Sequence, residues 1–476
     1  MGYIKEHCGL FGVYGCEDAV EKVYYGLYSL QHRGEESAGI ASTDGKDIIC
    51  RKGMGLISDA LDARMLKSLK NPVAIGHVRY STFGSSNIEN AQPMLVDYYR
   101  GKVAIAHNGQ LTNAKKLRDE FEGNGSIFHT TSDTEVIVHL MAKPSVSRQS
   151  GLPGVLNQLK GAFSLLILTP NEMIGVRDPY GFRPLSLGKL NNGGYAFASE
   201  TCALDQIGAE YVRDVQPGEI VSISKDGLRS EFYSNQKRYA ACIFELVYFS
   251  RPDSSVYGES VHLFRKRLGA KLAEESPVDA DVVISVPEGG NSAAIGYSHA
   301  TSIPFDRGFI RNHYVGRTFI LPQQDMRHRF VELKLNPLKE TVAGKRVIVI
   351  DDSIVRGTTS KSRFGLLRKA GAKEIHARIS CPPHRHPCYY GIDFQQKGEL
   401  IAANKTVEET RKFLNVESLS YLSVEGMMSC TTQPRQNFCN ACFTSDYPTN
   451  VNEEMDNVTD SFSVDEAERL SRCVIK

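Results

Sequence analysis

VIVIDDSIVRGTT, residues 347–359, is the stretch of this 476-residue sequence that most constrains its fold. Its first four residues are β-branched and predict a buried strand of a parallel sheet. A loop with two acids, hydroxyls and Gly357 follows, and residues 361–370 then show a helical pattern that Gly371 ends. This order of strand, loop and helix is typical of a βαβ unit in an α/β domain.

The loop after this strand has the composition of a phosphate site. Ligands of open α/β sheets bind at the carboxyl ends of strands, and the next helix N-terminus favours an anion. Asp351 and Asp352 could accept hydrogen bonds from ribose hydroxyls or hold Mg²⁺, and Gly357 allows a close backbone approach. Hydroxyl donors and a helix cap would come from Thr358, Thr359 and Ser360. The alternative is an ordinary strand, loop and capped helix.

All thirteen positions resemble the phosphoribosylpyrophosphate (PRPP) motif of the type I phosphoribosyltransferases. The resemblance implies that Asp351 and Asp352 bind PRPP and Mg²⁺. It extends the PRPP site to Ser353, Arg356, Gly357, Thr358 and Thr359. Some transcriptional regulators keep this fold and motif only to sense PRPP.

Two further segments belong to the same resemblance. The basic segment 317–334 is similar to a loop that folds over PRPP, which makes Arg317 and Lys334 candidate PRPP contacts; the alternative is a solvated charged loop. Relatives often carry Ser or Thr at the position of Gly289, where a metal contact is expected. A Mg²⁺ contact at Gly289 could therefore involve only its backbone or a water molecule.

The two halves of the chain differ in their secondary-structure pattern. The first half predicts layered α+β structure with antiparallel sheets, with helices at residues 19–31 and 134–142. Its strand-like runs are residues 8–14, 73–80, 103–107, 163–168, 173–177, 195–199 and 220–223. From about residue 240, strands at 282–286 and 347–350 alternate with helices at 261–275 and 360–370. The polar stretch 230–239 is the expected boundary, which gives domains at 8–232 and 233–476.

Cys8 is followed by four motifs in order: QHRG at 31–34, GHVRYST at 76–82, HNG at 107–109 and TSDTE at 131–135. Together they resemble the glutaminase domain of the class II, N-terminal-nucleophile (Ntn) glutamine amidotransferases over about residues 8–220. The resemblance implies an αββα Ntn-hydrolase sandwich and removal of residues 1–7 as a propeptide.

Hydrolysis of an amide needs a nucleophile, a base and an oxyanion hole. If residues 1–7 are removed, the free α-amino group of Cys8 can serve as the base for its own thiol. The resemblance implies that the Asn108 side chain and the Gly109 N–H form the oxyanion hole. It further implies that Arg79 binds the glutamine α-carboxylate and Asp133 its α-ammonium. Taken singly, each residue could equally form a surface ion pair or a turn.

A class II glutaminase followed by a type I PRPP domain is similar to the glutamine–PRPP amidotransferase family. Motifs such as RDPYGFRPL at 177–185 and YVGRTFI at 314–320 extend the resemblance over almost the whole chain. It implies that ammonia from glutamine replaces pyrophosphate at C1 of PRPP, giving 5-phosphoribosylamine in the first committed step of purine biosynthesis. It also implies inhibition by purine nucleotides and a homodimer or homotetramer.

The chain has eleven cysteines and no apolar signal segment, which favours a reducing, cytoplasmic location over a disulfide framework. Cys439 and Cys442 form a Cys-x-x-Cys pair, which fits half a zinc site, a redox pair or a cluster site. The family resemblance implies a [4Fe–4S] cluster with Cys242 and Cys388 as the other two ligands.

The composition is that of a globular enzyme, with 41% hydrophobic and 23% charged residues and a net charge of +1. Nothing in it indicates a nucleic-acid or membrane partner, and there is no apolar run of 18 residues. Two alternatives remain: a regulator that binds PRPP without catalysis, and a class II amidotransferase with another acceptor. The intact nucleophile motif argues against the first, and the PRPP motif against the second.

Overall fold

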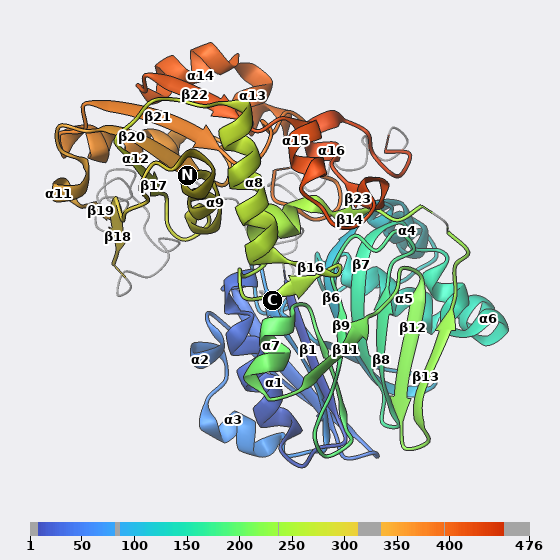
Figure 1. The fold of residues 1–476 in the computed structure, drawn as a ribbon. Coiled ribbons are helices and arrows are strands. Elements are labelled where there is room, and N and C mark those ends of the chain that lie inside the picture. Colours follow the sequence, from blue (N-terminus) through green and yellow to red (C-terminus); the bar gives the residue numbers. More distant parts are fainter. Residues whose placement is uncertain (1–7, 81–85, 237, 313–334, 395, 452–476) are drawn as a thin grey trace, which may run out of the picture.

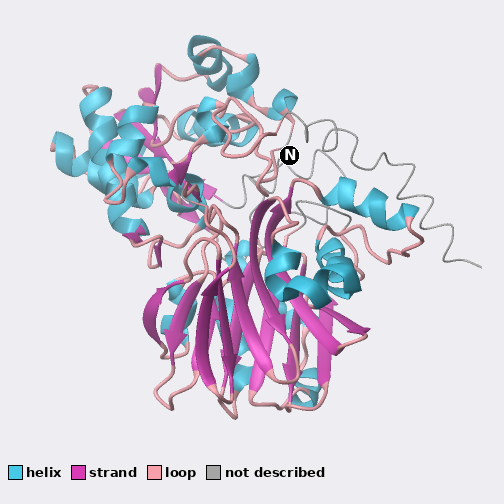
Figure 2. Cartoon of the chain, turned by 90° about the vertical axis from the view of Figure 1, so that its right-hand side faces the viewer, coloured by secondary structure: helices cyan, strands magenta, loops and turns pink. Residues whose placement is uncertain are grey.

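The structure is a computed structural model that describes residues 8–80, 86–236, 238–312, 335–394 and 396–451. It has two regions, which are the lower and upper parts of Figure 1. The lower region is a sandwich of two sheets with strands running side by side, and the upper region surrounds a smaller sheet (Figure 2). Among the described residues, no helix is long and apolar enough to cross a membrane.

Two antiparallel sheets form the sandwich. The first has the order β11-β9-β10-β1-β4-β2-β3, with β1 (Gly9–Tyr14), β2 (Ser37–Thr43), β3 (Ile48–Met54), β4 (Val73–Arg79), β9 (Ser186–Lys189), β10 (Tyr195–Ala198) and β11 (Glu210–Asp214). The second has the order β13-β12-β8-β7-β6-β5, with β5 (Met94–Tyr98), β6 (Gly101–Leu111), β7 (Gly161–Leu168), β8 (Glu172–Arg177), β12 (Glu219–Ser224) and β13 (Gly227–Phe232). Leu10, Ile75, Ala104 and Leu166 are fully buried in the core between them.

Helices cover both outer faces of the sandwich. The first sheet is covered by α1 (Ala19–Ser29) and α7 (Thr201–Gln206), with the short α2 (Ile57–Ala60) and α3 (Ala63–Ser68) nearby. The second sheet is covered by α4 (Ala114–Gly123), α5 (Thr134–Ala142) and α6 (Pro144–Leu156). The layers therefore follow the order helix, sheet, sheet, helix, and the predicted αββα sandwich is confirmed.

The upper region contains the predicted parallel sheet. Its order is β17-β20-β21-β22, with β17 (Val282–Ser285), β20 (Arg346–Asp351), β21 (Glu374–Ile379) and β22 (Ser418–Tyr421), and every pair is parallel. The helices around it include α8 (Val261–Glu275), α9 (Asn291–Thr301), α11 (Lys339–Val342), α12 (Thr358–Lys369), α13 (Ile401–Asn404), α14 (Val407–Leu414), α15 (Val424–Ser429) and α16 (Ala441–Thr444). This region is the α/β half that the strand at 347–350 predicts.

Three small sheets complete the upper region. They pair β14 (Ala241–Cys242) with β23 (Phe438–Cys439), β15 (Ser255–Val256) with β16 (Glu259–Ser260), and β18 (Phe309–Arg311) with β19 (Leu335–Pro337). The first pair is parallel and joins the start of this region to its C-terminal part. The ring of Phe182, from the sandwich, stacks on Tyr390 of the upper region at 4.1 Å between centroids. The two regions therefore share packed side chains.

Two local predictions differ from the structure. The helix after the acidic loop begins at Thr358, with Gly357 at its N-cap in the left-handed region (φ 75°) and no side-chain cap. The predicted hydroxyl cap is wrong, because the glycine takes the cap position and the threonines lie inside the helix. Residues 230–232, expected in the polar boundary, belong to β13, where they pair with β12.

Candidate active sites

Cys8 immediately precedes β1, whose first residue pairs with Val78 of β4. The register brings the Cys8 thiol to the end of β4, where Sγ lies 3.6 Å from the Tyr80 carbonyl oxygen. Burial raises the pKa of the Cys8 thiol, and the positive charge of Arg79 opposes this only in part. The thiol is therefore neutral near pH 7 and needs a base before it can attack an amide.

Asn108 and Gly109 lie near the end of β6, a strand that packs against β1 and β4. Asn108 is fully buried, and neither Oδ1 nor Nδ2 has a hydrogen-bond partner among the described residues. A buried amide without partners is costly, so this side chain is suited to a ligand oxygen. Gly109 has φ 146°, and a Cβ there would lie 2.0 Å from the Ala162 carbonyl oxygen. Only glycine fits this position.

Asp133, at the N-cap of α5, and Arg79, at the end of β4, are both buried. Asp133 Oδ2 accepts from the Leu111 N–H at 2.9 Å, and its Oδ1 lies 3.7 Å from His107 Nδ1. Burial alone would raise the pKa of Asp133, but His107 and the Leu111 N–H lower it overall. Arg79 Nη1 lies 3.8 Å from Glu36 Oε2. The opposite charges of Arg79 and Asp133 both act on the Cys8 thiol.

Asp351 ends β20 at the carboxyl edge of the parallel sheet, Asp352 follows it, and both are buried. Arg363 Nη1 donates to Asp351 Oδ2 at 3.2 Å, and Ser353 Oγ donates to Asp352 Oδ1 at 2.7 Å. Burial, together with repulsion from Asp352, raises the pKa of Asp351. Burial also raises the pKa of Asp352. Such a pair attracts a cation or hydroxyl donors.

The glycines around this acid pair lie in close contact with neighbouring side chains. A Cβ on Gly289 would lie 1.8 Å from Asp352 Oδ2, so a Ser or Thr there would require the Asp352 carboxylate to move. A Cβ on Gly357 would lie 2.6 Å from the Ile401 side chain. Gly289 therefore lets the loop after β17 approach Asp352 without moving its carboxylate.

The remaining predicted PRPP residues have different surroundings. Thr358 and Thr359 open α12, and Arg356 Nη2 donates to Glu399 Oε2 at 2.7 Å. Arg317 and Lys334 lie outside the described residues.

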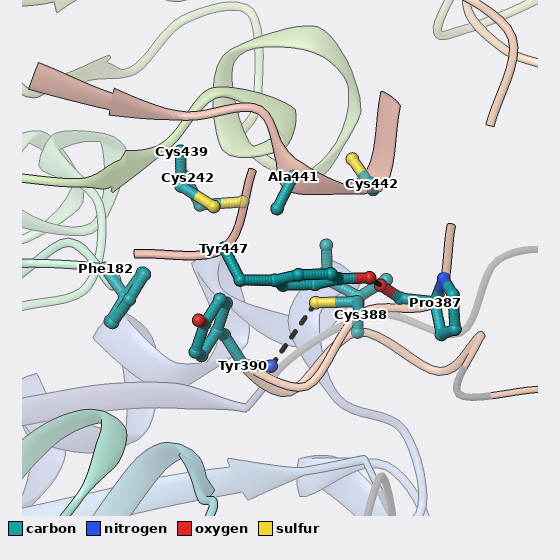
Figure 3. Close-up of a pocket in the computed structure, with 10 residues that line it drawn as sticks. Phe182, Cys242, Pro387, Cys388, Tyr390, Cys439, Ala441, Cys442 and Tyr447 are labelled. Atoms are coloured by element: carbon teal, nitrogen blue, oxygen red, sulfur yellow. Dashed lines mark hydrogen bonds between the residues drawn. The ribbon is translucent and has the colours of Figure 1, made fainter. Parts of the chain in front are cut away.

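Cys242, Cys388, Cys439 and Cys442 line one pocket, together with Phe182, Tyr390 and Tyr447 (Figure 3). Cys242 and Cys439 are paired in the β14–β23 register, and the Tyr390 N–H donates to Cys388 Sγ at 3.4 Å. Burial raises the pKa of Cys242 to about 11 and also raises that of Cys388. Thiols so shifted are neutral unless a bound metal stabilises the thiolates.

The described residues contain no group of three or more metal-ligating side chains of the kind that holds a metal ion. A [4Fe–4S] cluster binds each thiolate at a different iron, so its four ligands stand farther apart than those of one ion. Four cysteines in a pocket lined by aromatic rings fit that group in number and chemistry.

Arg33, Arg183, Glu200 and Glu245 form a cluster of ion pairs that the sequence did not point to, and all four are fully or almost fully buried. Arg33 and Arg183 lie in QHRG and RDPYGFRPL, two motifs that carry the resemblance, and Glu245 lies three residues after Cys242. The position of the two arginines inside these motifs was the only sign in the sequence that these buried charges matter.

An αββα sandwich with a cysteine before its first strand, followed by a parallel sheet with a terminal acid pair, defines a glutamine amidotransferase joined to a phosphoribosyltransferase-like domain. The family model of the glutamine amidotransferase domain matches residues 77–206. The amidophosphoribosyltransferase of Bacillus subtilis is 48% identical over 457 residues, covering 95% of this chain and 96% of the relative. The chain belongs to the amidophosphoribosyltransferase family.

Solved structures agree with this assignment. The glutamine PRPP amidotransferase of B. subtilis, complexed with ADP and GMP, matches with a TM-score of 0.88 at 48% identity, over 93% of this chain and 98% of that chain. A structure described as the allosteric regulatory enzyme of purine biosynthesis matches with a TM-score of 0.89 at 47% identity, over 96% and 98%. These matches confirm the predicted fold class over both halves.

Proposed function

We propose that the protein converts glutamine, PRPP and water into 5-phosphoribosylamine, pyrophosphate and glutamate, the first step of purine biosynthesis. Family membership over nearly the full chain is the observation that carries this proposal. The acid pair at the end of β20 supports it, because the alternative amidotransferases with other acceptors do not need that motif.

The first half-reaction is glutamine hydrolysis at Cys8. Once residues 1–7 are removed, the α-amino group takes the thiol proton, and Sγ attacks the side-chain amide carbon of glutamine. The unpartnered Asn108 amide and the Gly109 N–H stabilise the oxyanion. Ammonia leaves with the proton, and water hydrolyses the thioester to glutamate. Arg79 and Asp133 hold the α-carboxylate and α-ammonium of the substrate.

The second half-reaction takes place at the carboxyl edge of the parallel sheet. Asp351 and Asp352 bind the ribose hydroxyls or hold Mg²⁺, and the loop 353–359 receives the 5-phosphate at the N-terminus of α12. Ammonia attacks C1 as the bond to pyrophosphate breaks. Mg²⁺, when bound, offsets the charge of the pyrophosphate. Arg317 and Lys334 are further proposed contacts, and a metal contact at Gly289 would involve its backbone or a water molecule.

We further propose that Cys242, Cys388, Cys439 and Cys442 hold a [4Fe–4S] cluster. The all-thiol donor set in one buried pocket supports it. Because its ligands come from three separate segments, the cluster would tie the start of the upper region to the C-terminal part, and its loss would favour unfolding.

Regulation, assembly and location follow the family. Purine nucleotides inhibit the enzyme, in keeping with the B. subtilis structure that was complexed with ADP and GMP. The protein works in the cytoplasm as a homodimer or homotetramer.

Pyrophosphate release tests the proposal, with anaerobically purified protein, PRPP, Mg²⁺ and glutamine as the sole nitrogen donor. The N-terminus is first confirmed as Cys8 by mass spectrometry. Glutamine-dependent release is expected. No release from such protein, together with tight PRPP binding by calorimetry, would instead support a regulator that senses PRPP.

A further inference from the structure

A buried arginine joins the main chain of the nucleophile to a carboxylate from the other half of the protein. Arg33 Nε donates to the Cys8 carbonyl oxygen at 3.2 Å. The same guanidinium forms a two-pronged ion pair with Glu245, from Nη1 to Oε2 at 3.0 Å and from Nη2 to Oε1 at 2.8 Å. Its Nη1 also donates to Glu200 Oε1 at 2.5 Å. The Cys8 backbone is therefore anchored through a rigid planar group.

Glu245 has a second arginine on its other side. Arg183 Nη1 donates to Glu245 Oε1 at 3.2 Å, and Arg183 Nη2 donates to the Tyr390 carbonyl oxygen at 2.6 Å. The next residue, Gly391, lies against the oxyanion glycine, since a Cβ on Gly391 would be 3.1 Å from the Gly109 carbonyl carbon. The Glu245 carboxylate is therefore linked through Arg33 to the nucleophile Cys8 and through Arg183 to the loop beside the oxyanion residue Gly109.

Burial makes this arrangement stiff. Glu245 and Arg183 are fully buried and Arg33 is 1% exposed, so water cannot replace any of their contacts. Removing the charge of Glu245 would leave Arg183 without its carboxylate partner. Glu245 begins the π-helix η2 (Glu245–Phe249), outside both sandwich sheets. The glutaminase site therefore depends on a group from the other half.

We propose that Glu245 is a positioning residue of the glutaminase. Through Arg33 it sets the position of the Cys8 backbone, and through Arg183 it sets the loop at Tyr390 and Gly391 that packs against Gly109. The inference rests on the proposed role of Cys8 and Gly109. Nucleophile and oxyanion donors must meet one substrate carbon, and a shift of about 1 Å between them costs about 100-fold in rate.

The test compares Glu245→Gln with Glu259→Gln in the full-length, cluster-containing protein. Glu259 is a matched control, because it is also buried and pairs with an arginine, Arg267, at 2.6 Å, but bonds to Thr432 far along the chain from the glutaminase motifs. Glu245→Gln should lower kcat with glutamine about 100-fold with little change in the KM for glutamine. Activity with ammonia as donor should stay within about twofold of the parent. Glu259→Gln should change both activities in the same proportion.

Two further variants keep the result decisive. Glu245→Asp retains the charge and should recover part of the glutamine-dependent kcat. Arg33→Lys retains a charge but cannot span Cys8 and both Glu245 oxygens, so it should also lower glutamine-dependent kcat selectively. If Glu245→Gln does not fold, Arg33→Lys decides. Equal loss of both activities in a folded Glu245 or Arg33 variant, or unchanged glutamine use, would overturn the inference. An unsubstituted protein that cannot use glutamine would instead refute the proposed function.

Discussion

Two pairs of buried carboxylates in this protein differ in how their charge is balanced. Glu200 and Glu245 lie where the two halves meet, and Asp351 and Asp352 lie at the end of β20. All four are 7% exposed or less. The same chemical group at similar burial therefore serves two purposes, and the neighbouring charges decide which.

The first pair is matched by cations. Glu200 accepts from Arg33 Nη1 and from His32 Nε2 at 2.7 Å, and these partners lower its pKa although burial alone would raise it. At the acid pair, Arg363 bonds to Asp351 and Arg265 acts on Asp352 through its charge alone, and burial together with repulsion between the two carboxylates still raises the pKa of both. The first pair, which is bonded to two arginines, links the two halves of the protein, whereas the acid pair, which is bonded to one, is suited to a cation or hydroxyl donors.

Substituting the nucleophile should separate the two regions most strongly. Cys8→Ser should lower glutamine-dependent activity by at least about 1,000-fold, because a hydroxyl is a far weaker nucleophile than a thiolate. Activity with ammonia should persist, because the acid pair is untouched. Steady-state pyrophosphate release with each nitrogen donor checks this. Loss of both activities in a folded variant would argue against two separable sites.

Removing a carboxylate from the ion pairs between the two halves should lower the stability of the fold. Glu200→Gln removes the charge that faces Arg33 and His32, and should lower the free energy of unfolding by about 3 kcal/mol. Urea titration followed by circular dichroism measures this. Glu417→Gln is the control, since its pair with Arg368 at 2.8 Å is solvent-exposed and should be worth less than about 1 kcal/mol. Equal effects of the two variants would contradict the comparison.

Weakening the acid pair should lower PRPP-dependent activity without lowering the stability of the fold. Asp352→Asn should lower activity about 100-fold with either glutamine or ammonia as donor. Its unfolding free energy should not fall, because the substitution relieves repulsion with Asp351. Kinetics with both donors and urea titration without Mg²⁺ provide the check. If only the glutamine-dependent activity fell, the acid pair would act in glutamine hydrolysis and not at the PRPP site.

His384 extends the comparison to a buried group with no charge partner. Its ring lies 4.6 Å from that of Phe443, neither ring nitrogen has a hydrogen-bond partner in the described part of the chain, and burial lowers its pKa to about 3. The unfolded chain binds a proton below about pH 6.5, so this group costs stability as the pH falls from there.

His384→Phe should therefore stabilise the protein relative to the parent increasingly below pH 6.5, by about 2 kcal/mol at pH 5. Thermal or urea unfolding of both proteins at pH 7.5 and pH 5 measures the difference. A gain that does not grow with acidity would mean that His384 is protonated in the folded state.

Much of the fold could be predicted because its signals are local. The strand and loop at 347–359 appear as β20 and the approach to α12, and helices 134–142 and 261–275 match α5 and α8. Strands such as β2 and β9 were missed, because their buried residues include small or polar ones such as Ser37, Gly39 and Ser186. Such strands lack the apolar alternation on which the prediction depends.

The sequence predicted the individual site residues but not which distant residues pair with one another. Cys8, Asn108 and the acid pair stand in recognisable motifs, but Arg33 and Glu245 are 212 positions apart. With 56 Lys and Arg and 55 Asp and Glu in the chain, a pairing at that separation cannot be chosen from sequence.

The sequence by itself determined the two halves, the nucleophile motif and the acid pair, because each depends on residues that are neighbours along the chain. Only the tertiary structure decided that Glu245 of one half balances Arg33 and Arg183 of the other, and that Gly289 lies against the Asp352 carboxylate. Both depend on burial and close contact between distant segments. Desolvation makes such contacts energetically decisive, and it arises only once the chain has folded.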